Sequence, residues 1–313
     1  MKRTWIYNAT IVNEGLKFAG SVVVEDDTIC EVLQGEVRPS VPCDAEIDAR
    51  GCYLIPGVID DHVHFRDPGL THKADMASET AAAAAGGVTS FMDMPNCNPQ
   101  TTTLEALENK FADAANKCIV NYSFYFGATN NNTELLQQLD KKHVCGVKLF
   151  MGASTGNMLV DRIESLRKIF SEAGMLIAAH CEDQTIIRWN TELVKSKYGE
   201  EDVDILFHPR IRSEEACWRS SSLAVQLAKE TGARLHILHV STARELELFE
   251  DKPISEKKIT SEACVSHLMF CDEDYKTLGA RIKCNPSIKT KNDRDMLRRA
   301  LTTNRIDVIG TDH

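Results

Sequence analysis

Short apolar runs alternate with longer helix-like segments over most of this chain, and this alternation restricts its possible folds more than any other feature. Strands that alternate with helices pair in parallel through right-handed crossovers. Eight such units close into a barrel rather than an open sheet. The predicted strands span residues 54–59, 88–92, 119–126, 146–150, 175–179, 234–240, 258–262 and 306–310. The predicted helices span residues 75–85, 104–115, 133–140, 161–173, 185–197, 214–231, 243–250 and 292–302. The predicted fold class is therefore α/β, a TIM-like (β/α)8 barrel.

Residues 1–53 follow a different pattern. Short runs rich in β-branched and aromatic residues at 5–7, 21–24 and 28–33 are separated by turn residues, which is typical of short strands. The sequence therefore predicts two domains, a small β module over residues 1–53 and the barrel over residues 54–313.

Charge and composition argue against several classes of partner. The chain carries 36 Lys and Arg against 46 Asp and Glu, a formal net charge of −10. An acidic surface repels phosphate backbones, and no basic stripe with interleaved aromatic residues is present, so we expect no nucleic-acid partner. No apolar run approaches the roughly 20 residues that a membrane helix needs, so we expect no membrane partner either.

The cysteines point to a reducing environment. Eleven cysteines are scattered from Cys30 to Cys284, and none forms a Cys-x-x-Cys pair. This odd, dispersed set argues against a disulfide framework and against a zinc ribbon. We therefore expect reduced thiols and a cytoplasmic enzyme or scaffold, with Cys181 as a packing residue beside a functional histidine.

Residues with metal-binding chemistry stand near the carboxyl ends of five predicted strands, where barrel enzymes carry their active sites. They are His62, His64, Lys148, His180, His239 and Asp312. Two residues apart on a strand, His62 and His64 project to the same side and can hold one metal. Imidazole and carboxylate suit Zn²⁺ first, with Mn²⁺, Co²⁺ and Fe²⁺ also open. The alternative for this histidine pair is two ordinary side chains on a half-exposed strand.

Lys148 is an unusual member of this set. An ammonium group with a pKa near 10.4 is a poor metal ligand. Reaction of the amine with CO₂ gives a carbamate, whose two oxygens and negative charge can bridge a pair of metals as a carboxylate would. The alternative is a lysine that caps the barrel mouth or binds an anion.

Several motifs resemble those of dihydroorotases in the amidohydrolase superfamily. The first runs from His62 to Gly69 as His-Val-His-Phe-Arg-Asp-Pro-Gly, with Gly57 ahead of it. Later ones follow in the expected order at residues 94–96, 147–153, 179–182, 239–242, 284–286 and 310–313. The resemblance spans residues 57–313, and so many ordered matches are more specific than any single one. It implies that residues 1–53 are the first part of a small β-sandwich.

The resemblance also implies a role for each candidate residue. His62 and His64 would bind the more buried of two divalent metals, with Zn²⁺ expected. A CO₂-derived carbamate on Lys148 would bridge both ions, and the second ion would be held by His180 and His239. Asp312 would ligate the first ion and act as the catalytic acid and base. Some dihydroorotases use an aspartate as the bridge, but the Val-Lys-Leu-Phe context here favours the lysine carbamate, which hydantoinases also use. The residues implied in binding the substrate carboxylate are Arg66, Asn96 and Asn285.

The implied reaction is the reversible cyclisation of N-carbamoyl-L-aspartate to L-dihydroorotate in de novo pyrimidine biosynthesis. Two ions that share a water lower its pKa and polarise the carbonyl that it attacks. Asp312 would take the proton and pass it to the departing ring nitrogen. A guanidinium pairs with a carboxylate through two hydrogen bonds, so Arg66 favours dihydroorotate over simple hydantoins and dihydropyrimidines, which lack a carboxylate.

Several alternatives stay open. Arg66 could instead form a salt bridge that stabilises its loop, with Asp67 or Asp75. The activity could be that of another cyclic amidohydrolase, namely a dihydropyrimidinase or hydantoinase, or an allantoinase. A non-catalytic dihydroorotase-like scaffold is the alternative from another class. The expected partner is a small-molecule substrate, and the family implies a homodimer.

The remaining features are given smaller roles. His236 stands three residues before His239, an odd offset that predicts an outward-facing side chain. Surface positions are predicted for His72, His143 and His208, and a supporting role without metal contact is predicted for His267. Residues 151–157 are predicted to form a flexible loop over the site, and Ser213 is predicted to start a helix.

The position of the last residue also gives an expectation. The chain stops at His313, directly after the last expected ligand, whereas members of the resembled family continue through an eighth barrel helix and further sandwich strands. We therefore expect a C-terminally truncated chain with exposed apolar surface, low stability and weak activity. Expression beside a version extended past His313 would test this.

Overall fold

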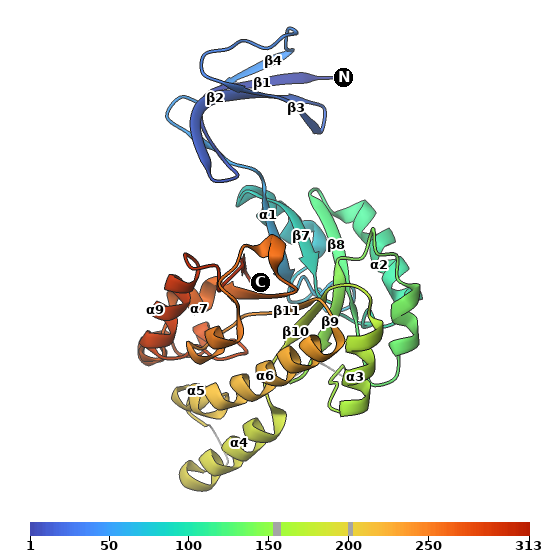
Figure 1. The fold of residues 1–313 in the computed structure, drawn as a ribbon, viewed down its shortest axis with the longest axis vertical. Coiled ribbons are helices and arrows are strands. Elements are labelled where there is room, and N and C mark those ends of the chain that lie inside the picture. The colour runs from blue at the N-terminus through green and yellow to red at the C-terminus, as the bar shows by residue number, and fades with distance from the viewer. Residues whose placement is uncertain (153–157, 200–202) are drawn as a thin grey trace. The chain divides into compact units, whose positions relative to one another are not determined.

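The computed structural model of the protein describes residues 1–152, 158–199 and 203–313. These residues form two compact units, Met1–Val58 and Ile59–His313, each drawn in Figure 1. Among the described helices, none combines the length and apolar character that a bilayer crossing requires.

The smaller unit is a five-stranded sheet with the order β3-β2-β1-β4, in which β5 also pairs with β1. Its strands are β1 (Arg3–Asn13), β2 (Leu16–Glu25), β3 (Thr28–Gln34), β4 (Ala45–Asp48) and β5 (Tyr53–Leu54). Apolar residues alternate along β1 and β2, so that Ala9, Ile11 and Val22 form one buried cluster. Ile29 and Val32 on β3 remain exposed.

The larger unit contains the predicted barrel. Its strands are β6 (Val58–Val63), β7 (Val88–Asp93), β8 (Asn121–Gly127), β9 (Gly146–Phe150), β10 (Ile177–His180), β11 (Leu235–Ile237), β12 (Ile259–Cys264) and β13 (Val308–Gly310). They follow one another in chain order across an eight-stranded sheet, and every neighbouring pair from β7 to β13 is parallel. Backbone hydrogen bonds from His64 N to His313 O (2.6 Å) and from Asp312 N to His62 O (2.9 Å) join the first strand to the last. The prediction of a (β/α)8 barrel is confirmed.

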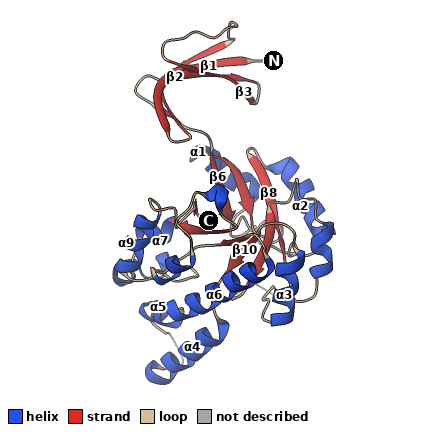
Figure 2. Ribbon diagram, in the orientation of Figure 1, coloured by secondary structure: helices blue, strands red, loops and turns tan. Residues whose placement is uncertain are grey.

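Helices surround these strands (Figure 2). The α-helices are α1 (Met76–Ala85), α2 (Leu104–Lys117), α3 (Ile163–Glu172), α4 (Gln184–Tyr198), α5 (His208–Ile211), α6 (Glu214–Thr231), α7 (Val265–Met269), α8 (Tyr275–Leu278) and α9 (Lys291–Ala300). The 3-10 helices are η1 (Thr133–Gln138), η2 (Ile205–Phe207), η3 (Arg244–Leu248), η4 (Ile254–Glu256), η5 (Asp272–Asp274) and η6 (Gly279–Ile282). The helices predicted at residues 133–140 and 243–250 are therefore short 3-10 turns. Ser213 caps α6 by accepting a hydrogen bond from Ala216 N, so the predicted helix start is confirmed.

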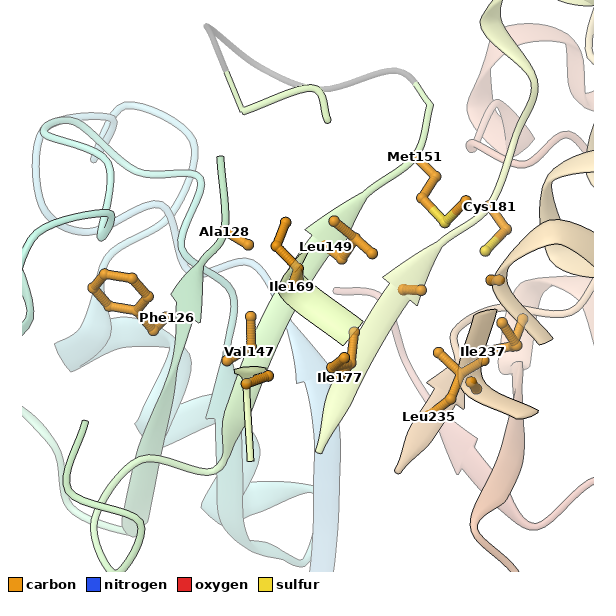
Figure 3. Close-up of a cluster of buried hydrophobic side chains, with 14 of the residues drawn as sticks. Phe126, Ala128, Val147, Leu149, Met151, Ile169, Ile177, Cys181, Leu235 and Ile237 are labelled. Atoms are coloured by element: carbon orange, nitrogen blue, oxygen red, sulfur yellow. The ribbon is translucent and has the colours of Figure 1, made fainter. Parts of the chain in front are cut away.

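Alternation along the barrel strands separates two layers of side chains. Val147 and Leu149 on β9, with Ile177 on β10, belong to the main core and lie beside Ile169 of α3 (Figure 3). Full burial of such a side chain contributes about 1.5–3 kcal/mol each. Residues between them, such as Lys148, point to the other face of the sheet, which is the barrel interior. The same alternation that builds the core thus delivers polar side chains to the interior.

Candidate metal centre

His62, His64 and Asp312 bring three ligand atoms together at the open end of the barrel. The Oδ1 atom of Asp312 lies 3.2 Å from His62 Nε2 and 3.1 Å from His64 Nε2, and the two Nε2 atoms are 3.2 Å apart. Ligand atoms bound tetrahedrally to one Zn²⁺ at about 2.0–2.1 Å stand about 3.3 Å from each other. The three atoms therefore have the spacing of one face of a metal coordination tetrahedron.

The other ring nitrogens of these histidines are held by acceptors. His62 Nδ1 lies 3.0 Å from Glu262 Oε1, and His64 Nδ1 lies 2.7 Å from Asn96 Oδ1. Each oxygen can accept a hydrogen bond from the Nδ1–H group, so Nε2 is the atom of each ring that a metal would bind. This arrangement is typical of metal-ligating histidines, whose second nitrogen is fixed by a carboxylate or carbonyl.

His180 and His239 form a second pair of candidate ligands. His180 ends β10, and its Nδ1 lies 2.9 Å from His239 Nε2. His180 Nε2 lies 3.0 Å from Glu182 Oε2, while the backbone N–H of His239 donates to Glu262 Oε1 at 2.8 Å. Glu262 therefore contacts one ligand of each pair.

Lys148 lies in the same cavity as these histidines. Its side chain is 1% exposed, and its Nζ stands 4.7 Å over the ring of Phe150. Within the described ranges it makes neither a hydrogen bond nor an ion pair. Burial lowers the pKa of its amine to about 8, although Asp312 and Glu262 act in the opposite direction. An amine with this pKa is partly neutral near neutral pH, and the neutral form is the one that CO₂ can carboxylate.

The site combines buried carboxylates with buried imidazoles. Although burial opposes it, the charges of Glu262 and Asp312 raise the pKa of His62 to about 10. Against the effect of burial, His62 and His64 hold the pKa of Asp312 well below its usual range. Burial lowers the pKa of His64, His180 and His239. Neutral His64, His180 and His239 beside an ionised Asp312 are in the protonation states that a divalent metal requires, and a bound ion would displace the extra proton of His62, so the donor set fits the implied ions.

A cavity of about 530 Å³ opens over these ligands. It is lined by His64, Arg66, Lys73, Ala74, Asn96, Lys148, Phe150, His180, His239, Lys283, Cys284, Asn285, Asp312 and His313. This volume suits a small-molecule ligand. Of the sequence-predicted site residues, only His62 is absent from the lining, since it is 1% exposed and lies beneath its neighbours.

Three of the candidate residues adopt a left-handed backbone conformation. Their φ angles are 62° at Arg66, 38° at His239 and 55° at Asp312. Such a conformation costs non-glycine residues on the order of 1–3 kcal/mol and is concentrated at functional sites. Each of these residues follows a barrel strand and turns its side chain into the cavity mouth.

Arg66 forms neither of the salt bridges considered for it. Its Nη1 donates to the backbone oxygen of Asn96 at 3.0 Å. Asp67 pairs with Lys117 at 3.0 Å, and Asp75 caps α1. The salt-bridge alternative is therefore wrong for the described residues, and Arg66 lines the cavity with Asn96 O as its one described side-chain hydrogen-bond acceptor.

The predicted outward orientation of His236 is wrong. The register pairs His236 with Ala178, which in turn pairs with Lys148, so these three side chains lie on the same face of the sheet, inside the barrel. His236 is 3% exposed. The odd offset from His239 misleads because β11 ends at Ile237, and the chain then turns before His239.

His208 is also not the surface residue that was predicted. It is 8% exposed, and its Nε2 lies 2.9 Å from the backbone oxygen of Cys284, beside the cavity. His267 is buried, and its Nε2 lies 3.0 Å from Pro286 O, so it supports the same loop. Of the predicted loop at 151–157, residues 153–157 lie outside the described residues.

Sequence reasoning missed four residues of this site. Glu182 and Glu262 hold ligand histidines, and the available signal for each was an acidic residue at or just after the end of a predicted strand. Lys73 and Lys283 line the cavity as exposed cations. Neither lysine belongs to a motif of the resemblance, so only the structure brings them beside Arg66.

Comparisons with known proteins agree with this geometry. The chain is 33% identical over 282 residues to an allantoinase of Deinococcus radiodurans, which covers 88% of this chain and 62% of that protein. It is 29% identical over 293 residues to a dihydroorotase of Methanosphaera stadtmanae, which covers 94% of this chain and 66% of that protein. The chain thus spans a little under two thirds of the length of these relatives.

Solved structures give the same result. An L-hydantoinase (dihydropyrimidinase) from Arthrobacter aurescens aligns with a TM-score of 0.90 and 27% identity, over all of this chain and 69% of that one. A sequence profile of the amidohydrolase family matches residues 53–313, which include every candidate ligand. With the barrel and its cluster of histidines, this match shows that the chain belongs to the amidohydrolase family.

Proposed function

We propose that this protein is a dihydroorotase, which closes N-carbamoyl-L-aspartate to L-dihydroorotate and reopens the ring in the reverse direction. The observation that carries the proposal is the charge of the cavity. Three cationic side chains, Arg66, Lys73 and Lys283, line it beside the metal ligands. The chain as a whole has a net charge of −10, so this local positive charge favours an anionic substrate.

The metal ligands support two divalent ions, with Zn²⁺ expected. His62, His64 and Asp312 would hold one ion, His180 and His239 the other, and Lys148 would reach both as its carbamate. The carbamate forms when the neutral amine attacks CO₂ and releases one proton. When bound, the ions supply an activated water and polarise the carbonyl of the substrate.

Asp312 would move the proton. Its carboxylate is ionised at neutral pH because the neighbouring histidines keep its pKa low against the effect of burial. It can therefore accept a proton in the ring-opening direction and deliver it to the departing ring nitrogen. In the ring-closing direction the same carboxylate works in reverse.

Arg66 would bind the carboxylate of the substrate. One nitrogen of its guanidinium is used on Asn96 O, and the planar group retains further N–H donors for two parallel hydrogen bonds. The Oδ1 atom of Asn96 accepts a hydrogen bond from His64 Nδ1, which leaves the amide N–H₂ group of Asn96 to donate to the substrate. Asn285 lines the same cavity from the opposite loop.

Substrate preference tests this proposal. We expect hydrolysis of L-dihydroorotate and little of dihydrouracil, hydantoin or allantoin. Arg66→Gln should lower kcat/KM for dihydroorotate on the order of 100-fold, which corresponds to about 2.7 kcal/mol. Arg66→Lys serves as the matched control, since it keeps the charge but loses the two-pronged geometry and should retain part of the activity.

Allantoinase is the second candidate, favoured by the similarity to the Deinococcus radiodurans protein of that name. Preferential turnover of allantoin, with no effect of Arg66→Gln on dihydroorotate, would overturn the dihydroorotase proposal in its favour. A lack of bound metal and of turnover after addition of Zn²⁺ would instead support the non-catalytic scaffold.

A further inference from the structure

A second polar cluster lies inside the barrel, beyond the candidate metal centre. It consists of Asp61 on β6, His236 on β11 and Glu262 on β12. His236 Nε2 lies 3.3 Å from Asp61 Oδ2 and 3.9 Å from Glu262 Oε2. The side chains of Asp61, His236 and Glu262 are 15%, 4% and 0% exposed, respectively. None of the roles assigned above to the ligands of the candidate centre uses Asp61 or His236.

Each of the three side chains has one buried polar atom that makes no hydrogen bond. Asp61 Oδ1, His236 Nε2 and Glu262 Oε2 are all buried without one. Buried polar atoms in native proteins are nearly always paired, so each exception needs an explanation. Three exceptions within one cluster suggest a missing ligand.

The hydrogen bond of His236 Nδ1 shows which of its ring nitrogens faces the carboxylates. Its Nδ1 lies 2.8 Å from Thr260 Oγ1. The hydroxyl of Thr260 donates its own proton to Leu235 O, so it accepts from Nδ1–H of the imidazole. Because Nδ1 is used on Thr260, Nε2 is the ring nitrogen that faces the two carboxylates, as a metal ligand would.

The spacing also suits an ion. The 3.3 Å separation of Asp61 Oδ2 and His236 Nε2 equals the edge of a tetrahedron with bonds of about 2.0–2.1 Å. One ligand atom from each of the three side chains lies within 4.8 Å of the others. A Cβ atom at Gly310 would stand 2.7 Å from Glu262 Oε2 and 3.2 Å from Asp61 Oδ1, so the glycine keeps the space beside both oxygens open.

We propose that Asp61, His236 and Glu262 bind a divalent metal at a site inside the barrel, in addition to the catalytic pair. Two carboxylates and one imidazole suit Zn²⁺ first. The ion would tie β6 to β11 and β12, although β6 is not a sheet neighbour of either. The role of this ion is structural. It is connected to the catalytic centre by Glu262, whose Oε1 atom accepts hydrogen bonds from His62 Nδ1 and His239 N.

Metal content of the whole protein tests the site. Zinc per chain is measured by mass spectrometry after dialysis against metal-free buffer, in the unaltered protein, in His236→Gln and in the control His143→Gln, which alters an exposed histidine. We expect the unaltered protein and the control to hold one zinc more than the catalytic pair accounts for, and His236→Gln to lose that one. Equal zinc content in all three proteins would overturn the proposal.

Anomalous scattering at the zinc edge gives a second readout on crystals of the unaltered protein, and it applies even if His236→Gln does not fold. A peak within about 2.1 Å of the three ligand atoms supports the site. A clean map there, with peaks only at the catalytic pair, would overturn the proposal. Neither readout depends on the substrate, so this inference can fail while the proposed activity holds.

Discussion

At the scale of single residues, the chemistry of Lys148 depends on where the barrel places it. On a surface its amine would be almost wholly protonated at neutral pH. Burial lowers the pKa of Lys148 to about 8, so a useful fraction of the amine is neutral and able to react with CO₂. The product is an anion beside histidines, where a bound metal pair would stabilise it.

Replacement of this lysine should therefore remove most of the catalytic activity, and an added small carboxylic acid should restore part of it. We expect Lys148→Ala to lower kcat on the order of 100-fold or more, a loss of about 2.7 kcal/mol or more. Acetate or propionate should restore part of the activity, because a small carboxylate can occupy the space of the carbamate. The readout is turnover of dihydroorotate with and without added acid.

Lys141→Ala is the matched control, since Lys141 is exposed and lies outside the cavity. It should show neither the loss nor the rescue. Unchanged turnover in Lys148→Ala would contradict the role given to this lysine.

Glu182 illustrates a residue that acts through another. It holds His180 Nε2 at 3.0 Å and also pairs with Arg212. Glu182→Gln keeps the shape but weakens this support, so we expect metal affinity to fall by about 10–100-fold. Titration with Zn²⁺ measures this directly, and most of the activity should return at saturating metal. A variant that binds Zn²⁺ as tightly as the unaltered protein would show that Glu182 only fills space.

At the scale of elements, the sequence was informative where one strand end carries one chemical group. Periodicity located seven of the eight barrel strands, and the first only in part, since the predicted strand at 54–59 overlaps β6 at Val58 and Ile59. The carboxyl ends of the predicted strands pointed to Lys148 and Asp312. The periodicity did not predict that the side chain of His236 points into the barrel, because this direction depends on where β11 ends. That end is set by packing against β10 and β12 rather than by local pattern.

The loop that carries Asn285 shows the same limit of prediction from the sequence. His208 on α5 reaches Cys284 O, and Ser287 Oγ donates to Arg212 O at 3.0 Å, so these contacts join segments that are far apart in the sequence. A histidine beside a proline, in a stretch that mixes apolar and charged residues, gives no local signal of burial. Only the tertiary contact shows that it supports the loop carrying Asn285.

Acid should loosen this loop. Burial lowers the pKa of His208, while the unfolded value is near 6.5. Below about pH 6.5 the unfolded chain takes up a proton that the folded chain does not, so stability falls until the lower folded pKa is passed. His208→Gln keeps a donor to Cys284 O but cannot titrate, and it should reduce the loss of stability between pH 7.5 and 5.5.

Urea unfolding at the two pH values measures this difference. His143→Gln is the control, because this histidine is exposed and should leave the pH dependence as it is in the unaltered protein. The assignment fails if both variants show the same acid sensitivity as the unaltered protein.

At the scale of the whole molecule, the candidate ligands come from β6, β9 and β10 and from the segments directly after β6, β11 and β13. The first and last of these strands are joined by a few backbone hydrogen bonds around His62, His64 and Asp312. A metal held by the same residues would therefore also hold the barrel closed. Without it, the buried carboxylate and imidazoles would have to be neutralised by protons, which is a weaker arrangement.

Removal of metal should consequently destabilise the barrel and not only stop turnover. An ion present at 100 times its Kd contributes about 2.7 kcal/mol to the folded state. For a domain of this size, each kcal/mol shifts Tm by about 2–4 °C, so stripping with a chelator should lower Tm by roughly 5–10 °C. Addition of Zn²⁺ should restore both Tm and activity, and chelator given with excess Zn²⁺ is the control. Equal Tm values with and without metal would mean that the strand ends hold together without the ions, and that the ligands serve chemistry alone.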